Sequence, residues 1–260
     1  MIKFHIVTAA YNCQNYIRKC LDMLSIQTYK NWDGVVVDDC STDNTLQIIK
    51  SALPKKMVCV ANTKNIGSLA NQHKALPMGC QKEKGAIKIS DEDVIVKVDG
   101  DDWLYDEHVL EKLAVYYNDP EVWMTYGSSI RSTTKQRGQT AKPVPKDYDF
   151  RKNRWVLSHL RSYKYFLWKN IYIDDLKSNR TKDFYTTSED CAIMKPMAEM
   201  AGWEHIKYID EVLYVYNLGN PIRDGAIHKR ETAVNGKEIH DSPRYSKQKK
   251  CELFAGIKER

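Results

Sequence analysis

The stretch VIVKVDGDDWLYDEH, residues 94–108, joins an aliphatic run to a dense group of acids. The run reads as a buried strand and ends in Asp99, Gly100, Asp101 and Asp102. Adjacent carboxylates repel one another unless protons, basic groups or a cation neutralise them. Divalent metals with oxygen ligands solve this problem, and Mg²⁺ is typically held by one or two carboxylates together with substrate phosphates. The stretch therefore predicts a metal site for a phosphate-bearing ligand; taken alone, it is also compatible with a capped turn whose acids face water.

Outward from this stretch, the first half of the chain alternates strand patterns with helix patterns. Short β-branched runs bounded by polar residues predict strands at residues 2–9, 33–39, 56–62 and 94–100. Apolar spacings of three and four predict helices at residues 15–28, 44–53 and 68–80. This alternation predicts the α/β class, with a Rossmann-like, mostly parallel sheet covered by helices on both faces.

In sheets of this kind, ligands bind beyond the carboxyl ends of the strands. We therefore expect four segments to share one rim: residues 8–12, Asp38 with Asp39, residues 62–67 and residues 99–102.

The second half of the chain is less regular. We expect helices at 106–118, at 188–202 and after residue 243, and strands at 121–130 and, one or two of them, at 204–217. An aromatic, partly helical segment is expected at 158–171. An exposed loop is expected at 131–149 and a mobile loop at 218–235. Pro196 is expected to kink or break the helix that contains it.

Composition places the chain among ordinary globular proteins. Of 260 residues, 42% are hydrophobic and 28% charged, with a net charge of +6. Seven cysteines without a C-x-x-C pair, no signal-peptide pattern and no long apolar window predict a cytoplasmic protein. Basic residues gather toward the C-terminus, and their positive charge is compatible with peripheral contact with an anionic membrane surface. We expect no nucleic-acid partner, and the oligomeric state stays open.

Two other ligand classes fit the sequence less well. A nicotinamide oxidoreductase needs a glycine fingerprint after the first strand, but TAAYNCQNY, residues 8–16, has no glycine. An EF-hand needs alternating oxygen ligands, where DEDVIVKVDG, residues 91–100, places aliphatic residues.

Five motifs in order, TAAYN, VVVDDCSTDNT, NIGSLANQ, VDGDDWL and SED, resemble the family-2 glycosyltransferases with the GT-A fold, over at least residues 2–217. The resemblance implies a metal-dependent, inverting transfer of a sugar to a hydroxyl of a glycan, glycolipid or glycoprotein. The donor it implies is a nucleotide-diphosphate sugar, UDP-linked rather than GDP-linked. It also implies a catalytic domain at 1–217, with a nucleotide-binding half at 1–104 and an acceptor-binding half at 105–217. Residues 218–260 are expected to form a mobile loop and a C-terminal helical extension.

The same resemblance implies a donor site. Its nucleotide contacts are Thr8, Ala10, Tyr11, Asn12, Asp39 (or Asp38), Asn65, Gly67, Asn71, Asp99, Gly100 and Asp101. Mn²⁺ or Mg²⁺ is expected on Asp101 and Asp99, with His228 as a further candidate ligand. Relatives often carry an arginine near Asn71; here Lys64, Lys74 and Arg161 are the candidates for neutralising phosphate.

On the acceptor or sugar side the resemblance implies Asp102, His159, Arg161 and Glu189. Asp190 matches the general base, a role that inverting transfer gives to one carboxylate, and Glu189 is the alternative base. A second function class remains open, namely a non-catalytic nucleotide-sugar or glycan-binding module on the same fold.

Overall fold

The structure is a computed structural model that describes residues 1–76, 89–222 and 227–256. Within these ranges the strands are β1 (Phe4–Ala10), β2 (Trp32–Asp38), β3 (Met57–Ala61), β4 (Val94–Lys97), β5 (Trp103–Leu104), β6 (Met124–Arg131), β7 (Arg161–Lys164) and β8 (Ile206–Tyr216). The helices are α1 (Ile17–Ser25), α2 (Thr45–Ala52), α3 (Ser68–Ala75), α4 (Val109–Tyr117), α5 (Tyr165–Trp168), α6 (Glu189–Ala201), α8 (Lys229–Asp241) and α9 (Lys250–Ala255). Two short 3₁₀ helices are η1 (Ile173–Leu176) and η2 (Trp203–His205).

All the strands join one sheet in the order β3-β2-β1-β4-β7-β6-β8-β5. The pairs β3-β2, β2-β1, β1-β4 and β6-β8 are parallel, whereas β7 and β5 run antiparallel to their neighbours. The predicted α/β class with a mostly parallel sheet is therefore confirmed.

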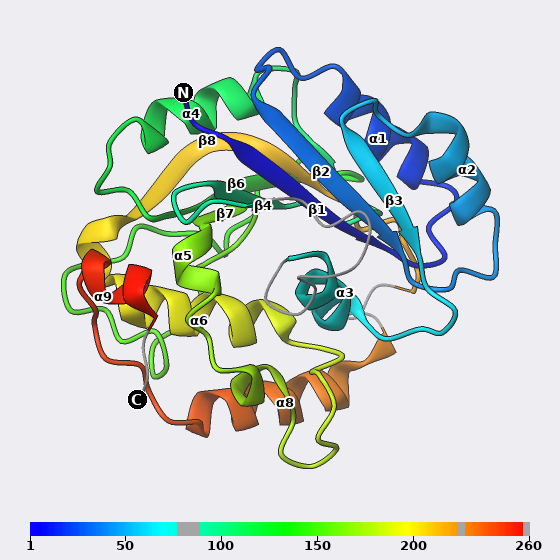
Figure 1. The fold of residues 1–260 in the computed structure, drawn as a ribbon. Helices are drawn as coiled ribbons and strands as arrows, with labels where there is room; N and C mark the ends of the chain where they lie inside the picture. The colour runs from blue at the N-terminus through cyan, green and yellow to red at the C-terminus, as the bar shows by residue number, and fades with distance from the viewer. Residues whose placement is uncertain (77–88, 223–226, 257–260) are drawn as a thin grey trace.

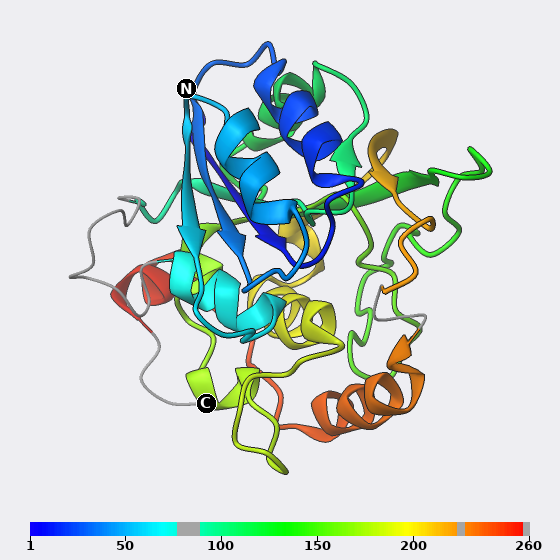
Figure 2. The ribbon, with the colours of Figure 1, turned by 90° about the vertical axis from the view of Figure 1, so that its right-hand side faces the viewer.

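Helices cover both faces of the sheet, as Figures 1 and 2 show. Alternate side chains of β2 enter different cores: Val36 packs with α1, α2 and α4, whereas Val35 and Val37 pack with α3, α5 and α6. Such alternation is what a strand covered on both faces requires. Beyond α6, α8 adds a further layer through Ile239 (Figure 1).

The register of the parallel strands brings their carboxyl ends together. Ala10 at the end of β1 pairs with Asp38 of β2, and Val7 of β1 pairs with Lys97 of β4. The chain then stays against β1, because Gly100 N–H donates to the Ala9 carbonyl at 2.9 Å. A Cβ at position 100 would lie 2.9 Å from that carbonyl oxygen, so the close approach of residues 99–102, the acid loop, requires glycine.

Most predicted elements of the first half are confirmed, with boundaries shifted by a few residues. The helix expected at 68–80 forms as α3, and residues 77–80 lie outside the described part of the chain. In the second half, the helix at 106–118 and the strand at 121–130 appear as α4 and β6, and a single strand, β8, lies within 204–217.

The partly helical character expected at 158–171 is confirmed by α5. A strand that was not expected, β7, precedes this helix, because these residues insert between β4 and β6. Two other expectations for the second half need correction. Helix α6 continues through Pro196 without a break, and the side chains on both sides of the proline are buried. The other expected effect of Pro196, a kink, stays a prediction. The loop expected at 218–235 gives way to α8 from Lys229, which is anchored where Asn235 donates to Thr187 Oγ1 at 3.0 Å; residues 223–226 lie outside the described ranges.

None of the helices in the described ranges combines the length and the apolar character that crossing a membrane requires.

Gly34 tests the close packing of the central strands. A Cβ there would lie 2.7 Å from the Ile6 carbonyl oxygen of β1, so Gly34→Ala is expected to lower the free energy of unfolding by about 1–3 kcal/mol. The matched control is Gly236→Ala in α8, where the nearest atom is 3.8 Å away and the free energy is expected to rise by about 0.5–1 kcal/mol. Urea denaturation of both variants measures the effect; equal stability of Gly34→Ala and the native chain would contradict it.

Candidate active site

The acid loop after β4 is held in place by the end of β8. Tyr214 Oη accepts a hydrogen bond from Asp99 N–H at 3.1 Å, and Asp102 Oδ1 accepts one from Asn217 N–H at 2.7 Å. Asp101 Oδ2 accepts a hydrogen bond from Asn220 Nδ2 at 2.8 Å. Strand β5 pairs with β8 directly after these acids, so the loop is fastened at both its start and its end.

Two buried cations face the acids. The ammonium of Lys97, the last residue of β4, lies 3.4 Å from Asp99 Oδ1, 2.9 Å from Glu189 Oε1 and 3.2 Å from Asp190 Oδ1. Arg161, at the start of β7, also forms an ion pair with Asp190. Glu189 and Asp190 begin α6, so these contacts bring the predicted base to the predicted metal-binding loop.

The charges of the acid loop are compensated unevenly. Burial alone would raise the pKa of Asp99, but the charge of Lys97 holds it well below its usual range. Burial and repulsion from Asp101 and Asp99 raise the pKa of Asp102 well above its usual range. Burial also raises the pKa of Asp101, and the charge of Asp99 adds to that rise. Neither Asp101 nor Asp102 forms an ion pair with a cation among the described residues, and burial and mutual repulsion therefore raise their pKa values.

His159 lies beside the acid loop as a neutral imidazole. Its ring stacks on Tyr214 and Tyr216, with centroids 4.9 and 5.0 Å apart. Burial and the charge of Arg161 lower the pKa of His159 to about 4. Arg161 donates a hydrogen bond to His159 Nε2, so this nitrogen carries no proton. Its distance to Asp99 Oδ2 is 3.8 Å.

The site fits a divalent cation. Asp99, Asp102 and His159 each present one ligand atom, and these atoms lie within 4.8 Å of one another. The two carboxylates suit Mn²⁺ or Mg²⁺, and a cation would relieve the repulsion between the acids. His159 Nε2 could join them as a ligand only without its hydrogen bond from Arg161. Asp101, predicted as a ligand, lies outside this group, with its carboxylate on Asn220; its role as a ligand stays a prediction.

Directly after β2, Asp39 organises the segment that follows β3. Its carboxylate accepts hydrogen bonds from Asn62 Nδ2 at 2.8 Å, Ile66 N–H at 2.9 Å and Gly67 N–H at 2.8 Å. Asn62 also donates to Asn71 Oδ1 at 2.7 Å. The predicted nucleotide contacts Asp39, Gly67 and Asn71 are thus joined in one network.

The remaining predicted nucleotide contacts differ in exposure. Tyr11 is 43% exposed, so its ring is accessible to a base. Thr8 is fully buried, and its hydroxyl has no hydrogen-bond partner among the described residues. Asn12 has a positive φ of 44°, and its side-chain oxygen accepts a hydrogen bond from Thr42 N–H at 2.8 Å. Ala10 is buried beside Gly100.

Four other predicted residues form no hydrogen bond or ion pair with the acid loop among the described residues. Asn65 and Lys64 are exposed, and Lys74 donates to Asn62 Oδ1 at 3.1 Å. His228 lies before α8, where its imidazole approaches Glu231 at 3.8 Å. These contacts give no support to His228 as a metal ligand.

Sequence reasoning missed Lys97, Tyr214 and Asn220. The sequence contains one indication that Lys97 has a role: a charged residue within an otherwise aliphatic, buried strand needs an oppositely charged partner. No local pattern indicates the contacts of Tyr214 and Asn220, because their partners in the acid loop are more than 100 residues away in the chain.

Residues 5–168 match the family model described as glycosyl transferase family 2. The chain is 25% identical over 231 residues to glycosyltransferase GlyA of Streptococcus pneumoniae, covering 83% of this chain and 30% of that protein. It is also 25% identical over 189 residues to the Escherichia coli UDP-Glc:alpha-D-GlcNAc-diphosphoundecaprenol beta-1,3-glucosyltransferase WfaP, covering 68% of this chain and 72% of that protein. The chain thus spans less than a third of GlyA.

Two solved structures share the fold. Staphylococcus aureus TarS 1–349 in complex with UDP has a TM-score of 0.61 and 22% identity, covering 90% of this chain and 65% of that chain. Mannosyltransferase PcManGT from Pyrobaculum calidifontis, in complex with GDP-Man and Mn²⁺, has a TM-score of 0.61 and 18% identity, covering 94% of this chain and 66% of that chain. The predicted GT-A architecture is confirmed by these likenesses together with the sheet.

Asp39→Asn tests the network on β2. An amide nitrogen cannot accept from a backbone N–H, so the variant leaves at least one donor of the 62–67 segment without its acceptor. The free energy of unfolding is expected to fall by about 1–3 kcal/mol in urea denaturation. The control is Asp22→Asn on α1, whose exposed pair with Arg18 is worth about 0.5 kcal/mol or less. Equal losses in the two variants would contradict the assignment.

Proposed function

Because the chain belongs to glycosyl transferase family 2, we propose that it transfers a sugar from a UDP-linked donor to a hydroxyl of a glycan, glycolipid or glycoprotein, with inversion at the anomeric carbon. One observation carries the proposal: Lys97 contacts the acid loop through Asp99 and the start of α6 through Asp190. A donor diphosphate at the acid loop and an acceptor at α6 would therefore meet at one place.

We assign the nucleotide to the rim formed by β1 and β2. The exposed ring of Tyr11 offers a stacking surface for the base. The segment 62–67 is held through its backbone by Asp39, at the carboxyl end of β2. Thr8 and Asn12 complete this side, and Asn71 supports it through Asn62.

The diphosphate is assigned to the acid loop. The candidates to hold Mn²⁺ or Mg²⁺ there are the group of Asp99, Asp102 and His159, together with Asp101, which the sequence motif predicts as a ligand. When bound, the cation supplies Lewis-acid stabilisation of the charge that develops on the leaving nucleoside diphosphate. Arg161 is the permanent cation nearest to His159 and the base, so it can contribute charge on the same side.

Asp190 is assigned as the general base. It takes the proton of the acceptor hydroxyl as the oxygen bonds to the anomeric carbon and the bond from that carbon to the phosphate oxygen breaks. The side chain of Asp190 is 34% exposed, whereas that of the alternative base Glu189 is 12% exposed and lies against Lys97. An acceptor therefore reaches Asp190 more readily.

The names of related proteins support UDP as the first donor class to test. WfaP is named for UDP-Glc, and TarS was solved with UDP, whereas PcManGT was solved with GDP-Man. We also propose residues 1–217 as the catalytic unit, with a nucleotide half at 1–104 and an acceptor half at 105–217. The remaining residues, 218–260, contribute Asn220 as a contact to the acid loop.

Asp190→Asn separates transfer from binding. The variant is expected to lose at least about 100-fold in kcat for sugar transfer, since the acceptor proton has no base to receive it. UDP affinity should stay within about twofold of the native value, because Asp190 is assigned to the acceptor side. Transfer is measured from UDP-sugars to simple glycoside acceptors, and product NMR reports the anomeric configuration.

Asp174→Asn, which changes a 93% exposed carboxylate on η1, is the matched control and should keep the native kcat. Loss of transfer in Glu189→Gln but not in Asp190→Asn would move the base to Glu189. UDP-sugar binding by the native protein with no transfer or hydrolysis of any donor would favour the alternative function, a non-catalytic nucleotide-sugar-binding module.

A further inference from the structure

Lys97 is a charged residue inside a fully buried strand. Its side chain is 8% exposed, and the other three residues of β4 are aliphatic and buried. Lysine is rarely buried without partners, because moving an ammonium out of water costs free energy that only opposite charges and hydrogen bonds offset. Here the partners are Asp99, Glu189 and Asp190, at 3.4, 2.9 and 3.2 Å.

These three carboxylates come from two distant segments. Asp99 belongs to the acid loop two residues after Lys97, whereas Glu189 and Asp190 form the first turn of α6, more than 90 residues later. The ammonium therefore sets the distance between the loop that we assign to the diphosphate and the helix that carries the proposed base. It also offsets repulsion among the three carboxylates, which would otherwise drive the segments apart.

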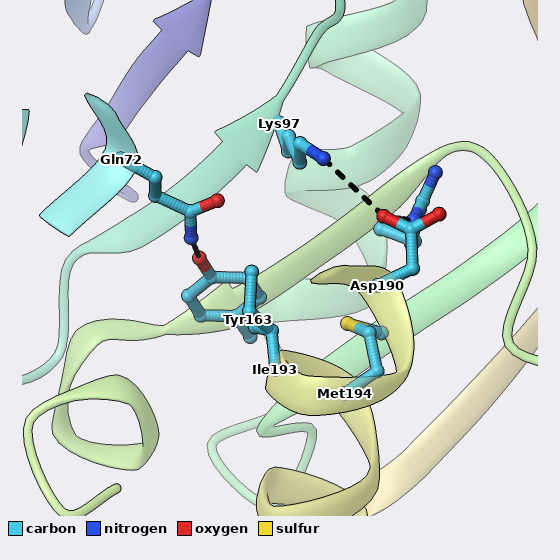
Figure 3. A pocket seen from close by; sticks show the side chains of 7 residues that line it. Gln72, Lys97, Tyr163, Asp190, Ile193 and Met194 are labelled. Atoms are coloured by element: carbon cyan, nitrogen blue, oxygen red, sulfur yellow. Dashed lines mark hydrogen bonds and ion pairs between the residues drawn. The ribbon is translucent and has the colours of Figure 1, made fainter. Parts of the chain in front are cut away.

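A small cavity lies between Gln72 and Asp190 (Figure 3). Its volume is about 10 Å³, close to the space that one water molecule needs. Gln72 Nε2 donates to Tyr163 Oη, while Gln72 Oε1 has no partner among the described residues and faces the cavity. Ile193 and Met194 close the cavity on the side of α6. The carboxylate of Asp190 borders this cavity and forms ion pairs with both Lys97 and Arg161, which fix its orientation.

We propose that Lys97 is a positioning residue, which fixes Asp190 and Glu189 against Asp99 so that the base points toward the acceptor. This inference rests on the proposed function and adds to it a residue that does not itself contact the donor. It assigns the effect of Lys97 to the transfer step rather than to nucleotide affinity.

Lys97→Met tests the assignment, because methionine keeps much of the side-chain volume and removes the charge. We expect kcat for transfer to fall by about 10- to 100-fold, as when a group that orients a reacting residue is lost. The KM for the UDP-sugar and the dissociation constant for UDP should change by less than about threefold. Lys97→Arg, which keeps the charge, should recover part of kcat. Lys97→Gln replaces Lys97→Met if circular dichroism shows that the methionine variant does not fold.

A double-mutant cycle asks whether Lys97 acts through Asp190. If it does, Lys97→Met should change the residual rate of Asp190→Asn by less than about twofold, although it lowers the native rate strongly. Independent effects that multiply in the double variant would overturn the inference.

Lys195 supplies a matched control. It lies on α6, is 7% exposed like Lys97, and forms no ion pair with any residue in the described ranges. Lys195→Met should therefore keep the native kcat and KM. An equal loss of kcat in both methionine variants would show that any buried lysine near α6 has the same effect, which would overturn a specific role for Lys97.

Different results would contradict the positioning role of Lys97 and the proposed sugar transfer. If the native protein transfers sugar and Lys97→Met keeps its kcat, or loses only UDP affinity, the inference is wrong and the proposed function stands. If the native protein transfers no sugar from any donor tested, the proposed function is wrong and the inference falls with it.

Discussion

An excess of carboxylates where β4 ends is the constraint on which the site depends. Asp99, Glu189 and Asp190 are compensated by Lys97 and Arg161. Asp101 and Asp102 have only hydrogen-bond donors, and their raised pKa values record the imbalance. A protein that holds this arrangement is prepared for a divalent cation, because the cation balances carboxylate charges that the chain leaves unbalanced and can bind a polyphosphate at the same time.

The fold places the charges by simple means. Parallel register aligns the carboxyl ends of β1, β2 and β4, and the lack of a side chain at Gly100 lets the acid loop lie against β1. Strand β7 then inserts beside β4 in the opposite direction, which brings Arg161 level with Lys97. Strand β8 fastens the loop from the other side through Tyr214. The sheet thus supplies the acids, both cations and their support.

Local sequence patterns were sufficient to predict most strands of the first half and the rim where the site lies. Runs such as residues 33–39 identify strands because β-branched residues alternate between two cores there, and the rule for parallel sheets then places Asp39 and Asp99 on one rim. The strand at residues 161–164 was not predicted, because its sequence, RSYK, has no alternation of apolar and polar residues. These residues are buried because β7 lies between β4 and β6. The pairings of Lys97 with Glu189 and of Asp101 with Asn220 link residues far apart in the chain, so no local sequence pattern predicts them.

The central claim is that the acid loop binds a nucleoside diphosphate through a divalent cation, and calorimetric titration tests it most directly. Native protein and Asp101→Asn are titrated with UDP in Mn²⁺ and again in EDTA, with GDP as the comparison. The account predicts UDP binding in Mn²⁺ that disappears in EDTA and weakens about tenfold or more in Asp101→Asn. Binding of GDP alone would keep the site and change the donor class. UDP binding that is unchanged by EDTA, or no metal-dependent binding of either nucleotide, would contradict the account.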